Sequence, residues 1–245
     1  MKVKSYIGNK VLGNSEVGTS NLVDRETWLK KSLESIPAGN RILDAGAGEM
    51  QYKKWCTHLK YVSQDFAQYD PSKVEFGLQM DKWDYKGLDI VCDITNIPEP
   101  AQSFDAIMCT EVIEHIPDPA RVFPEFSRLL KPGGTLILTA PFCSLTHFAP
   151  YHFSTGFSKF YYEKHLADNG FESVDIVFNG NFFEYMAQET RRLPIIAEKY
   201  SGQSLSTFDK FITRCFLKIL NRMSKSDKGS EEILCYGLQI RAKKK

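Results

Sequence analysis

The feature that most constrains the fold is a series of short apolar segments, several of which end in an acidic residue. Between them lie Gly-rich turns and stretches with helical periodicity. We expect strands at residues 41–44, 61–65, 88–93, 104–109 and 135–139. Strands that alternate with helices at this spacing are typical of an α/β fold with a mostly parallel, doubly wound sheet.

Helix signals fall between and after these strands. Asp24 is a candidate N-cap, Pro37 ends the pattern that follows it, and Gly170 closes a later one. The glycine turn after the first strand also predicts a helix behind it, as at the entry of a βαβ unit. We expect the other helices at residues 24–36, 118–130 and 158–169, and two further strands at residues 172–178 and 233–241.

The long stretch between the last two predicted strands is too long for a hairpin, so we expect a helical insertion at about residues 181–230. The main domain then covers residues 24–245, and residues 1–23 form an N-terminal arm or lid. Within the insertion, Ser206 and Asp209 are placed like a capping box. Apolar residues at helical spacing follow: Phe208, Phe211, Ile212, Cys215, Phe216, Ile219, Leu220 and Met223.

The predicted helix at residues 206–224 also carries Lys and Arg on its other faces. A basic amphipathic helix can lie on a membrane surface as a peripheral contact. The commoner arrangement is a helix packed on its own domain or on a second copy of the chain in a homodimer, and we favour that arrangement here.

The balance of charges and the cysteine content indicate which binding partners and which cellular compartment are expected. Thirty-one Lys and Arg stand against 30 Asp and Glu, so no global field draws the protein toward nucleic acid or an anionic membrane, and any basic surface must be local. The six cysteines form no CxxC pair, which indicates free thiols in a reducing compartment. The opening residues lack the apolar core of a secretory leader, and no apolar run approaches the ~20 residues of a membrane span. We therefore expect a cytoplasmic protein.

A candidate ligand site begins at the end of the first strand. Gly46 and Gly48 follow Asp44 and allow a sharp turn with close approach of a ligand to the backbone. A dinucleotide fingerprint would need a third glycine where this chain has Gln51. Asp65 lies nineteen residues beyond Gly46, a position suited to a ribose diol.

Asp93 and Ile94 end the third predicted strand. The carboxylate of Asp93 can accept a hydrogen bond from an exocyclic amine, and the backbone N–H of Ile94 can donate to a ring nitrogen, so the pair could fix an adenine edge. With these two residues added, the chain resembles the class I S-adenosylmethionine-dependent methyltransferases over roughly residues 40–180 and a closing strand near 233–241. The matching motifs, in order, are Leu43–Gly48, Asp65, Asp93-Ile94, Ser103–Asp105, Glu111–His115 and Leu129–Gly134.

This resemblance implies a seven-stranded sheet whose last strand is antiparallel, with S-adenosylmethionine as methyl donor and S-adenosylhomocysteine as product. It also implies the contacts of the cofactor. The methionine part would lie at Asp44, Gly46, Gly48, Cys109 and Thr110, the ribose at Asp65 and Phe66, and the adenine at Asp93 and Ile94.

Methyl transfer needs alignment of the reactants above all, and a base only where the acceptor arrives protonated. His152 and His147 follow the fifth predicted strand and are the best candidates for such a base. We therefore expect transfer to the oxygen of a small-molecule acceptor; alternatively, residues 150–153 form a purely structural turn. An apolar or ring-bearing acceptor is favoured by the nearby aromatic residues Phe142, Phe148, Tyr151, Phe153, Phe157, Tyr161 and Tyr162.

Two other functions stay open at this point. Glu111, Glu114, His115 and His152 resemble the metal-binding pattern of small-RNA 2′-O-methyltransferases and of some ubiquinone-pathway O-methyltransferases. Such a site would hold a divalent metal, Mg²⁺ or Mn²⁺. The sequence Glu111–His115 also occurs in methyltransferases that bind no metal, where it shapes the wall of the pocket. Our main prediction assigns no metal ligand. The third function is a regulatory protein that binds the cofactor without catalysis.

Overall fold

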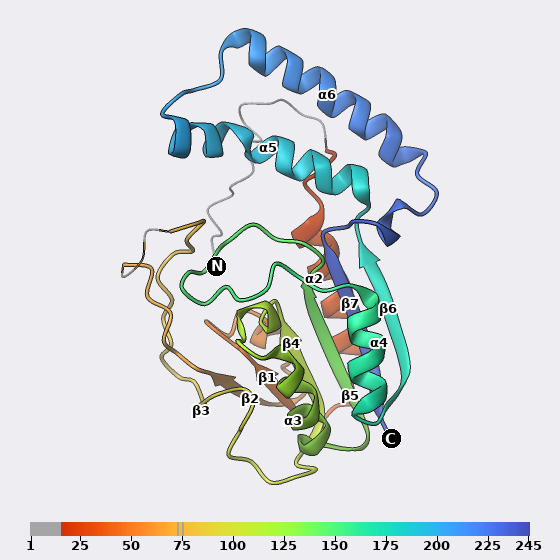
Figure 1. Ribbon diagram of the computed structural model, residues 1–245. Coiled ribbons are helices and arrows are strands. Elements are labelled where there is room, and N and C mark those ends of the chain that lie inside the picture. Colours follow the sequence, from red (N-terminus) through yellow and green to blue (C-terminus); the bar gives the residue numbers. More distant parts are fainter. Residues whose placement is uncertain (1–15, 73, 75) are drawn as a thin grey trace. The chain divides into compact units, whose positions relative to one another are not determined.

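A computed structural model describes residues 16–72, 74 and 76–245, so most of the predicted N-terminal arm lies outside the described residues. The fold is built on a seven-stranded sheet with the order β3-β2-β1-β4-β5-β7-β6 (Figure 1). Neighbouring strands from β3 to β5 run parallel, whereas β7 is antiparallel to β5. The predicted α/β fold with an antiparallel last strand is confirmed. The strands are β1 Arg41–Ala45, β2 Lys60–Asp65, β3 Ile90–Val91, β4 Phe104–Thr110, β5 Leu130–Pro141, β6 Phe171–Asn179 and β7 Gly237–Lys244.

The described helices match most of the predicted ones, with differences at the ends. The first begins at Asn21 rather than Asp24. The helix expected after β1 is replaced by a single 3₁₀ turn, Lys53–Trp55. The helices are α2 Asn21–Glu34, α3 Val122–Leu129, α4 Lys159–Asp168, α5 Phe182–Ser201 and α6 Thr207–Lys225.

Two predicted strand boundaries are wrong for local reasons. The third strand has only two residues, because the Asp89 carboxylate accepts hydrogen bonds from the backbone and hydroxyl of Ser63, at 2.8 and 2.7 Å, where strand pairing would otherwise continue. The Lys-Pro-Gly-Gly sequence does not separate a helix from a strand; it lies inside β5, which begins at Leu130. Leu130 opposite Phe104 starts this pairing, and a register shift follows.

The described chain forms two compact units. The first contains Arg25–Val177 and Gly237–Lys245, and therefore most of the sheet. The second contains Phe178–Tyr236 with the described residues up to Asp24. In the second unit, α6 packs along α5, and Leu217 and Leu220 share an apolar cluster with Ala187. No helix in the described part of the chain is long and apolar enough to cross a membrane.

The core of the first unit positions the carboxyl ends of the central strands. Leu29 and Leu33 of α2 pack against Ile42, Met108 and Ile137, which project from β1, β4 and β5. All five side chains are fully buried. Because β1, β2 and β4 are parallel neighbours, their carboxyl ends meet at one edge of the sheet, where ligands of open α/β folds bind.

The space around Gly46, directly after β1, shows how closely this edge of the sheet is packed. The φ of Gly46 is +80°, and an added Cβ would lie 2.4 Å from a methyl group of Val112. Gly39 has nearly the same φ, +82°, with nothing within 4 Å of an added Cβ. We expect Gly39→Ala to lower the free energy of unfolding by about 1 kcal/mol through backbone strain alone. Gly46→Ala should add an overpacking cost of about 1–3 kcal/mol.

Urea unfolding of the wild type, Gly39→Ala and Gly46→Ala measures the loss in free energy of unfolding that each substitution causes. Equal losses of stability in Gly39→Ala and Gly46→Ala would show that the contact between Val112 and the turn is not close.

Candidate functional site

The turn after β1 is joined to the end of β2 by hydrogen bonds. The backbone N–H groups of Gly46 and Ala47 donate to the Gln64 carbonyl at 2.9 and 2.8 Å. The N–H of Gly48 donates to Oδ2 of Asp65 at 2.8 Å, and Gly48 has a φ of +52°. The structure therefore brings Gly48 into direct contact with the predicted ribose-binding acid Asp65, and Gly46 into contact with the preceding residue, Gln64.

Asp44, the predicted acid before this turn, is buried in β1. The Tyr61 hydroxyl donates to its Oδ2. Burial, with a smaller contribution from the nearby charge of Asp65, raises the pKa of Asp44 to about 7. A cationic ligand would favour the ionised form, because an opposite charge offsets the cost of burying the carboxylate.

Asp65 and Asp93 end neighbouring parallel strands. Asp65 pairs with Val91, the last residue of β3. Asp93 therefore follows two residues after the position opposite Asp65. Asp65 is buried and also accepts from the Ala67 N–H at 2.8 Å, which leaves lone pairs on its carboxylate. Asp93 is exposed and accepts from the N–H and hydroxyl of Thr95, while Ile94 is buried.

The end of β4 contributes the remaining predicted cofactor contacts. Cys109 is fully buried, and burial raises the pKa of its thiol well above the usual range. The Thr110 hydroxyl oxygen is buried and has no hydrogen-bond partner. The chain then turns at Glu111, with a φ of +55°, and the Glu111 carboxylate contacts Arg25 at 2.7 Å. Thr110 therefore presents an unsatisfied polar atom at the edge where the cofactor is expected.

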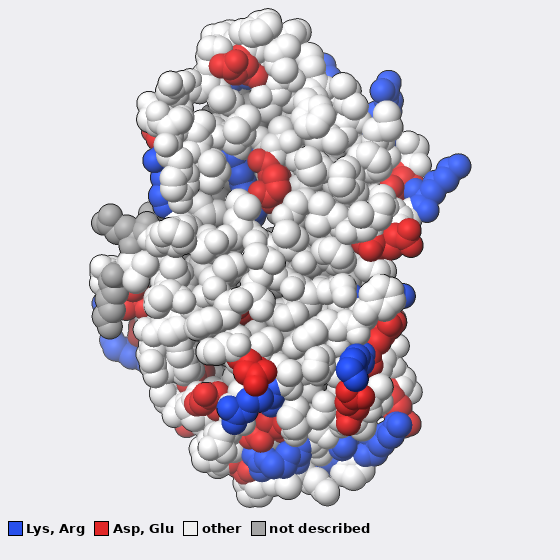
Figure 2. Space-filling model, viewed as in Figure 1, with Lys and Arg blue, Asp and Glu red and all other residues white. Residues whose placement is uncertain are grey.

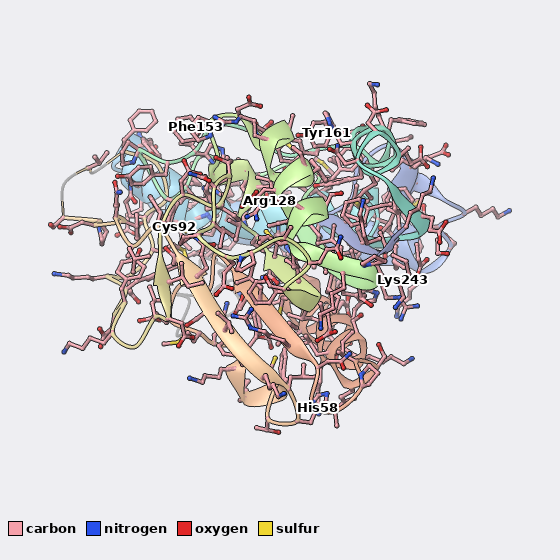
Figure 3. The ribbon with its side chains drawn as sticks, turned by 90° about the horizontal axis from the view of Figure 1, so that it is seen from below. His58, Cys92, Arg128, Phe153, Tyr161 and Lys243 are labelled. Carbon is pink, nitrogen blue, oxygen red and sulfur yellow. The ribbon has the colours of Figure 1, made fainter. Side chains whose placement is uncertain are left out.

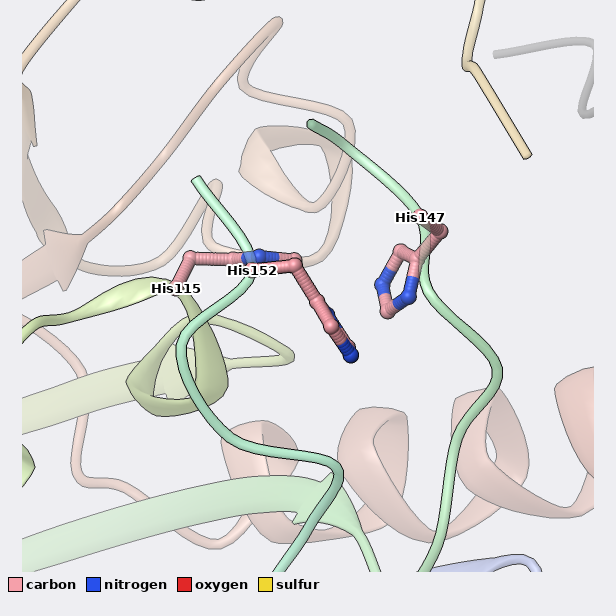
Figure 4. Close-up of side chains that lie close together, drawn as sticks. All are labelled: His115, His147 and His152. Atoms are coloured by element: carbon pink, nitrogen blue, oxygen red, sulfur yellow. The ribbon is translucent and has the colours of Figure 1, made fainter. Parts of the chain in front are cut away.

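Three of the five histidines gather beside this edge (Figure 4). Ligand atoms of His115, His147 and His152 all lie within 4.8 Å of one another. His115 Nδ1 is 2.5 Å from the Tyr151 carbonyl oxygen, and His147 Nδ1 is 2.9 Å from that of Leu145. If each Nδ1 carries the proton, the Nε2 of each ring is left as an acceptor.

His152 differs from its two neighbours in having no hydrogen-bond partner. Both of its ring nitrogens are buried and unpartnered. Burial and the proximity of His147 lower the pKa of His152. Burial, with the same neighbour, lowers the pKa of His115 to about 3. Both shifts favour the neutral imidazole of His115 and His152, and a neutral imidazole nitrogen can accept a proton.

Of the acidic residues of the predicted metal set, Glu114 approaches only His115, with its Oε1 3.7 Å from Nε2. Among the described residues, the only group of three or more mutually close His, Cys, Asp or Glu ligands consists of the three histidines. Glu111 is paired with Arg25. Glu114 lies in a 3₁₀ turn, Ile113–His115, and burial with the neighbouring Glu111 raises its pKa well above the usual range.

An aromatic cavity of about 420 Å³ adjoins the glycine turn. Tyr69, Trp83, Tyr85 and Tyr151 supply its rings, and Lys82 supplies a cation. An added Cβ on Gly48 would lie 2.5 Å from the Trp83 ring, which places this wall against the turn. Phe148 stacks on Tyr69 with the ring centroids 3.7 Å apart and lies 4.7 Å from His115, so the cavity wall and the histidines are continuous.

Sequence reasoning missed Tyr69, Trp83 and Tyr85. They lie in the long connection between β2 and β3, which has no periodicity to indicate an orientation. The one available signal was the density of aromatic residues in a segment without helix or strand pattern.

Several predicted pocket aromatics lie elsewhere. Phe153 is 49% exposed and lies at the margin of the molecule opposite His58 in the view of Figure 3. Phe157 stacks on Tyr161, and both belong with Tyr162 to a ring cluster around Phe123 of α3. These rings stabilise the packing of α4 against α3, and of the seven only Phe148 and Tyr151 are part of the aromatic wall.

Comparison with known proteins agrees with this geometry. Residues 43–138 match the family model described as a methyltransferase domain. The ubiquinone biosynthesis O-methyltransferase of Xanthomonas axonopodis pv. citri is 37% identical over 111 residues, 42% of this chain and 44% of that protein. The chain thus matches less than half the length of this curated relative.

Solved structures show the same fold at low identity. A phosphoethanolamine N-methyltransferase 2 of Haemonchus contortus, solved in complex with S-adenosyl-L-methionine, is 18% identical, with a TM-score of 0.52 over 99% of this chain and 57% of that one. The [4+2]-cyclase SpnF is 16% identical, with a TM-score of 0.56 over 95% of this chain and 84% of that one. A fold shared by a methyltransferase and a cyclase does not determine the reaction, which has to be argued from the site.

The residues at the sheet edge fit a nucleoside joined to an amino acid. Asp44 offers a buried carboxylate for a cationic amine, Asp65 keeps lone pairs for a diol, and the Thr110 hydroxyl lacks a partner. The glycines allow close approach of a ligand to the turn, whose N–H groups at Gly46, Ala47 and Gly48 are bonded to the end of β2. The contacts of S-adenosylmethionine with these residues stay a prediction.

The raised pKa of Asp44 predicts that the affinity for S-adenosylhomocysteine depends on pH. The free protein should hold a proton on Asp44 below about pH 7. Binding the ammonium group of S-adenosylhomocysteine requires the ionised carboxylate, so affinity should fall as the pH drops from 7 to 5.5, approaching tenfold per pH unit. Calorimetric titration of the wild type and Asp44→Asn measures this slope. A wild-type affinity that is as flat as that of Asp44→Asn would remove Asp44 from the ammonium site.

Proposed function

Because this chain belongs to the class I S-adenosylmethionine-dependent methyltransferases, we propose that it transfers the methyl group of that donor to a hydroxyl oxygen of a small, ring-bearing acceptor. The observation that carries the proposal is His152, whose two ring nitrogens are buried without a partner and which directly follows Tyr151 of the cavity lining. Unpaired buried nitrogens are costly in a folded protein, and a bound hydroxyl would satisfy one of them.

The cavity supports a small acceptor with an aromatic or apolar ring. Its volume of about 420 Å³ suits a molecule of this size, and Tyr69, Trp83 and Tyr151 offer ring faces and edges for stacking. The name of the partly aligned relative, an O-methyltransferase, agrees with oxygen as the methylated atom.

S-adenosylmethionine, when bound, supplies a methyl group on a cationic sulfur that leaves as a neutral thioether. His152 accepts the hydroxyl proton as the acceptor oxygen forms its bond to the methyl carbon, and later releases that proton to solvent. The aromatic wall excludes water and aligns the acceptor with the methyl group, which supplies most of the acceleration of an in-line displacement. Tyr151 and Leu145 hold His115 and His147 through their backbone carbonyls, so the neighbouring rings keep their orientation.

Replacement of His152 tests the proton transfer. We expect His152→Ala to lower kcat by about 10²–10⁴-fold with little change in the affinity for S-adenosylhomocysteine. His58→Ala, far from the site, is the matched control and should retain wild-type kcat. Because the pKa of His152 is lowered, wild-type activity should persist below pH 6.5, where an ordinary histidine is already half protonated.

Turnover is measured as S-adenosylhomocysteine formed on a panel of phenols and alcohols. A His152→Ala enzyme as fast as wild type would mean that residues 150–153 are only a structural turn. A wild type that binds the cofactor and methylates nothing on a broad panel would favour the regulatory alternative.

Chelation separates this proposal from a metal-assisted reaction. Three imidazoles suit a transition metal, whereas Mg²⁺ prefers oxygen ligands, which the group of three histidines lacks. We expect activity to be unchanged after treatment with EDTA and desalting, with far less than one metal ion per chain by elemental analysis. Activity that disappears with EDTA and returns with Mg²⁺ or Mn²⁺ would contradict proton transfer to His152 alone and favour the metal-assisted alternative.

A further inference from the structure

Helix α6 has three distinct faces along its length. Thr213, Leu217 and Leu220 are buried, and the two leucines share the apolar cluster with α5. This face is not the predicted apolar stripe, of which Leu220 alone is buried. The other large apolar side chains therefore need a different explanation from packing within the second unit.

These side chains form what we call the outer face of α6. They are 37–70% exposed, and their spacing of three or four residues places them on one side of the helix. Proteins that act in water rarely expose a contiguous apolar surface of this kind unless it binds something. The outer face consists of Phe208, Phe211, Ile212, Phe216, Ile219 and Met223.

Basic residues follow one margin of the outer face. Lys210, Arg214, Lys218 and Arg222 recur every fourth residue, and Lys225 follows at the end of the helix. The only acidic residue of α6 is Asp209, which is engaged in the N-terminal capping box with Ser206. In the view of Figure 2, wide uncharged stretches lie over α5 and α6, with both Lys or Arg and Asp or Glu between and beside them.

We propose that the outer face of α6 docks on an anionic membrane surface. The apolar side chains would enter the boundary between headgroups and acyl chains while the basic margin contacts anionic headgroups, which is how interfacial amphipathic helices bind. Each Lys or Arg near such a surface contributes attraction that is screened by salt.

Charge decides between a membrane and a second copy of the chain. A symmetric dimer through this face would bring together two helices with five cations and one acid each, and that acid already caps its own helix. An anionic lipid surface would place negative charge along the whole basic margin. The 19 residues of α6 extend about 28 Å, and no described helix is apolar enough to span a bilayer, so α6 would lie along the surface.

Vesicle flotation with the full chain tests the proposal. We expect binding to phosphatidylcholine vesicles that contain 30% phosphatidylglycerol, weak binding to pure phosphatidylcholine vesicles, and weaker binding as NaCl rises from 0.05 to 0.5 M. Phe211→Asp with Ile219→Asp should reduce binding more than tenfold. Lys218→Gln with Arg222→Gln should weaken binding to the anionic vesicles by about 25-fold, or fivefold for each cation.

Phe160→Asp is the matched control, because Phe160 is 68% exposed but lies on α4; this variant should bind vesicles like the wild type. All variants are first compared with the wild type for affinity toward S-adenosylhomocysteine, which shows that they are folded. Equal binding to neutral and anionic vesicles would overturn the proposal. So would a dimer in sedimentation analysis that Phe211→Asp with Ile219→Asp dissociates, since the outer face would then bind a second copy.

Discussion

The candidate site depends on one hydrogen-bonded junction, in which the Asp65 carboxylate at the end of β2 accepts the N–H groups of Gly48 and Ala67. Gly48 belongs to the turn after β1, so this carboxylate holds the ends of two neighbouring strands at a constant spacing. Hydrogen bonds to a charged acceptor are stronger than neutral ones, and burial strengthens them further. The turn can therefore keep its positive φ values at Gly46 and Gly48 while its N–H groups bond to the end of β2.

Around this junction the protein buries several ionisable groups without balancing each with an opposite charge. Asp44 has its pKa raised to about 7, Glu114 has a strongly raised pKa, and His115 has a pKa of about 3. These shifts have one physical cause, the cost of charge in a poorly solvated place. A cationic donor bound at this edge would favour the ionised form of Asp44, because an opposite charge offsets the cost of burying the carboxylate.

The central strands were predictable because their apolar runs are short, buried and ended by polar residues. β1, β2 and β4 differ from prediction by one residue at most at either end. The site residues drawn from the strand ends follow from the same pattern, since parallel strands present their carboxyl ends at one edge. The connection between β2 and β3 has no such pattern, and Trp83 reaches the glycine turn only through tertiary packing. Periodicity likewise predicted α6, but it could not say which of its faces packs on α5.

The central claim is that the ends of β1, β2 and β4 form a cradle for an adenosyl amino acid. Titration calorimetry of the full chain with S-adenosylhomocysteine, and in parallel with NADH, tests it most directly. The account predicts saturable binding of one S-adenosylhomocysteine per chain and no heat of binding with NADH. Absence of S-adenosylhomocysteine binding at millimolar concentration, or preferential binding of NADH, would contradict it.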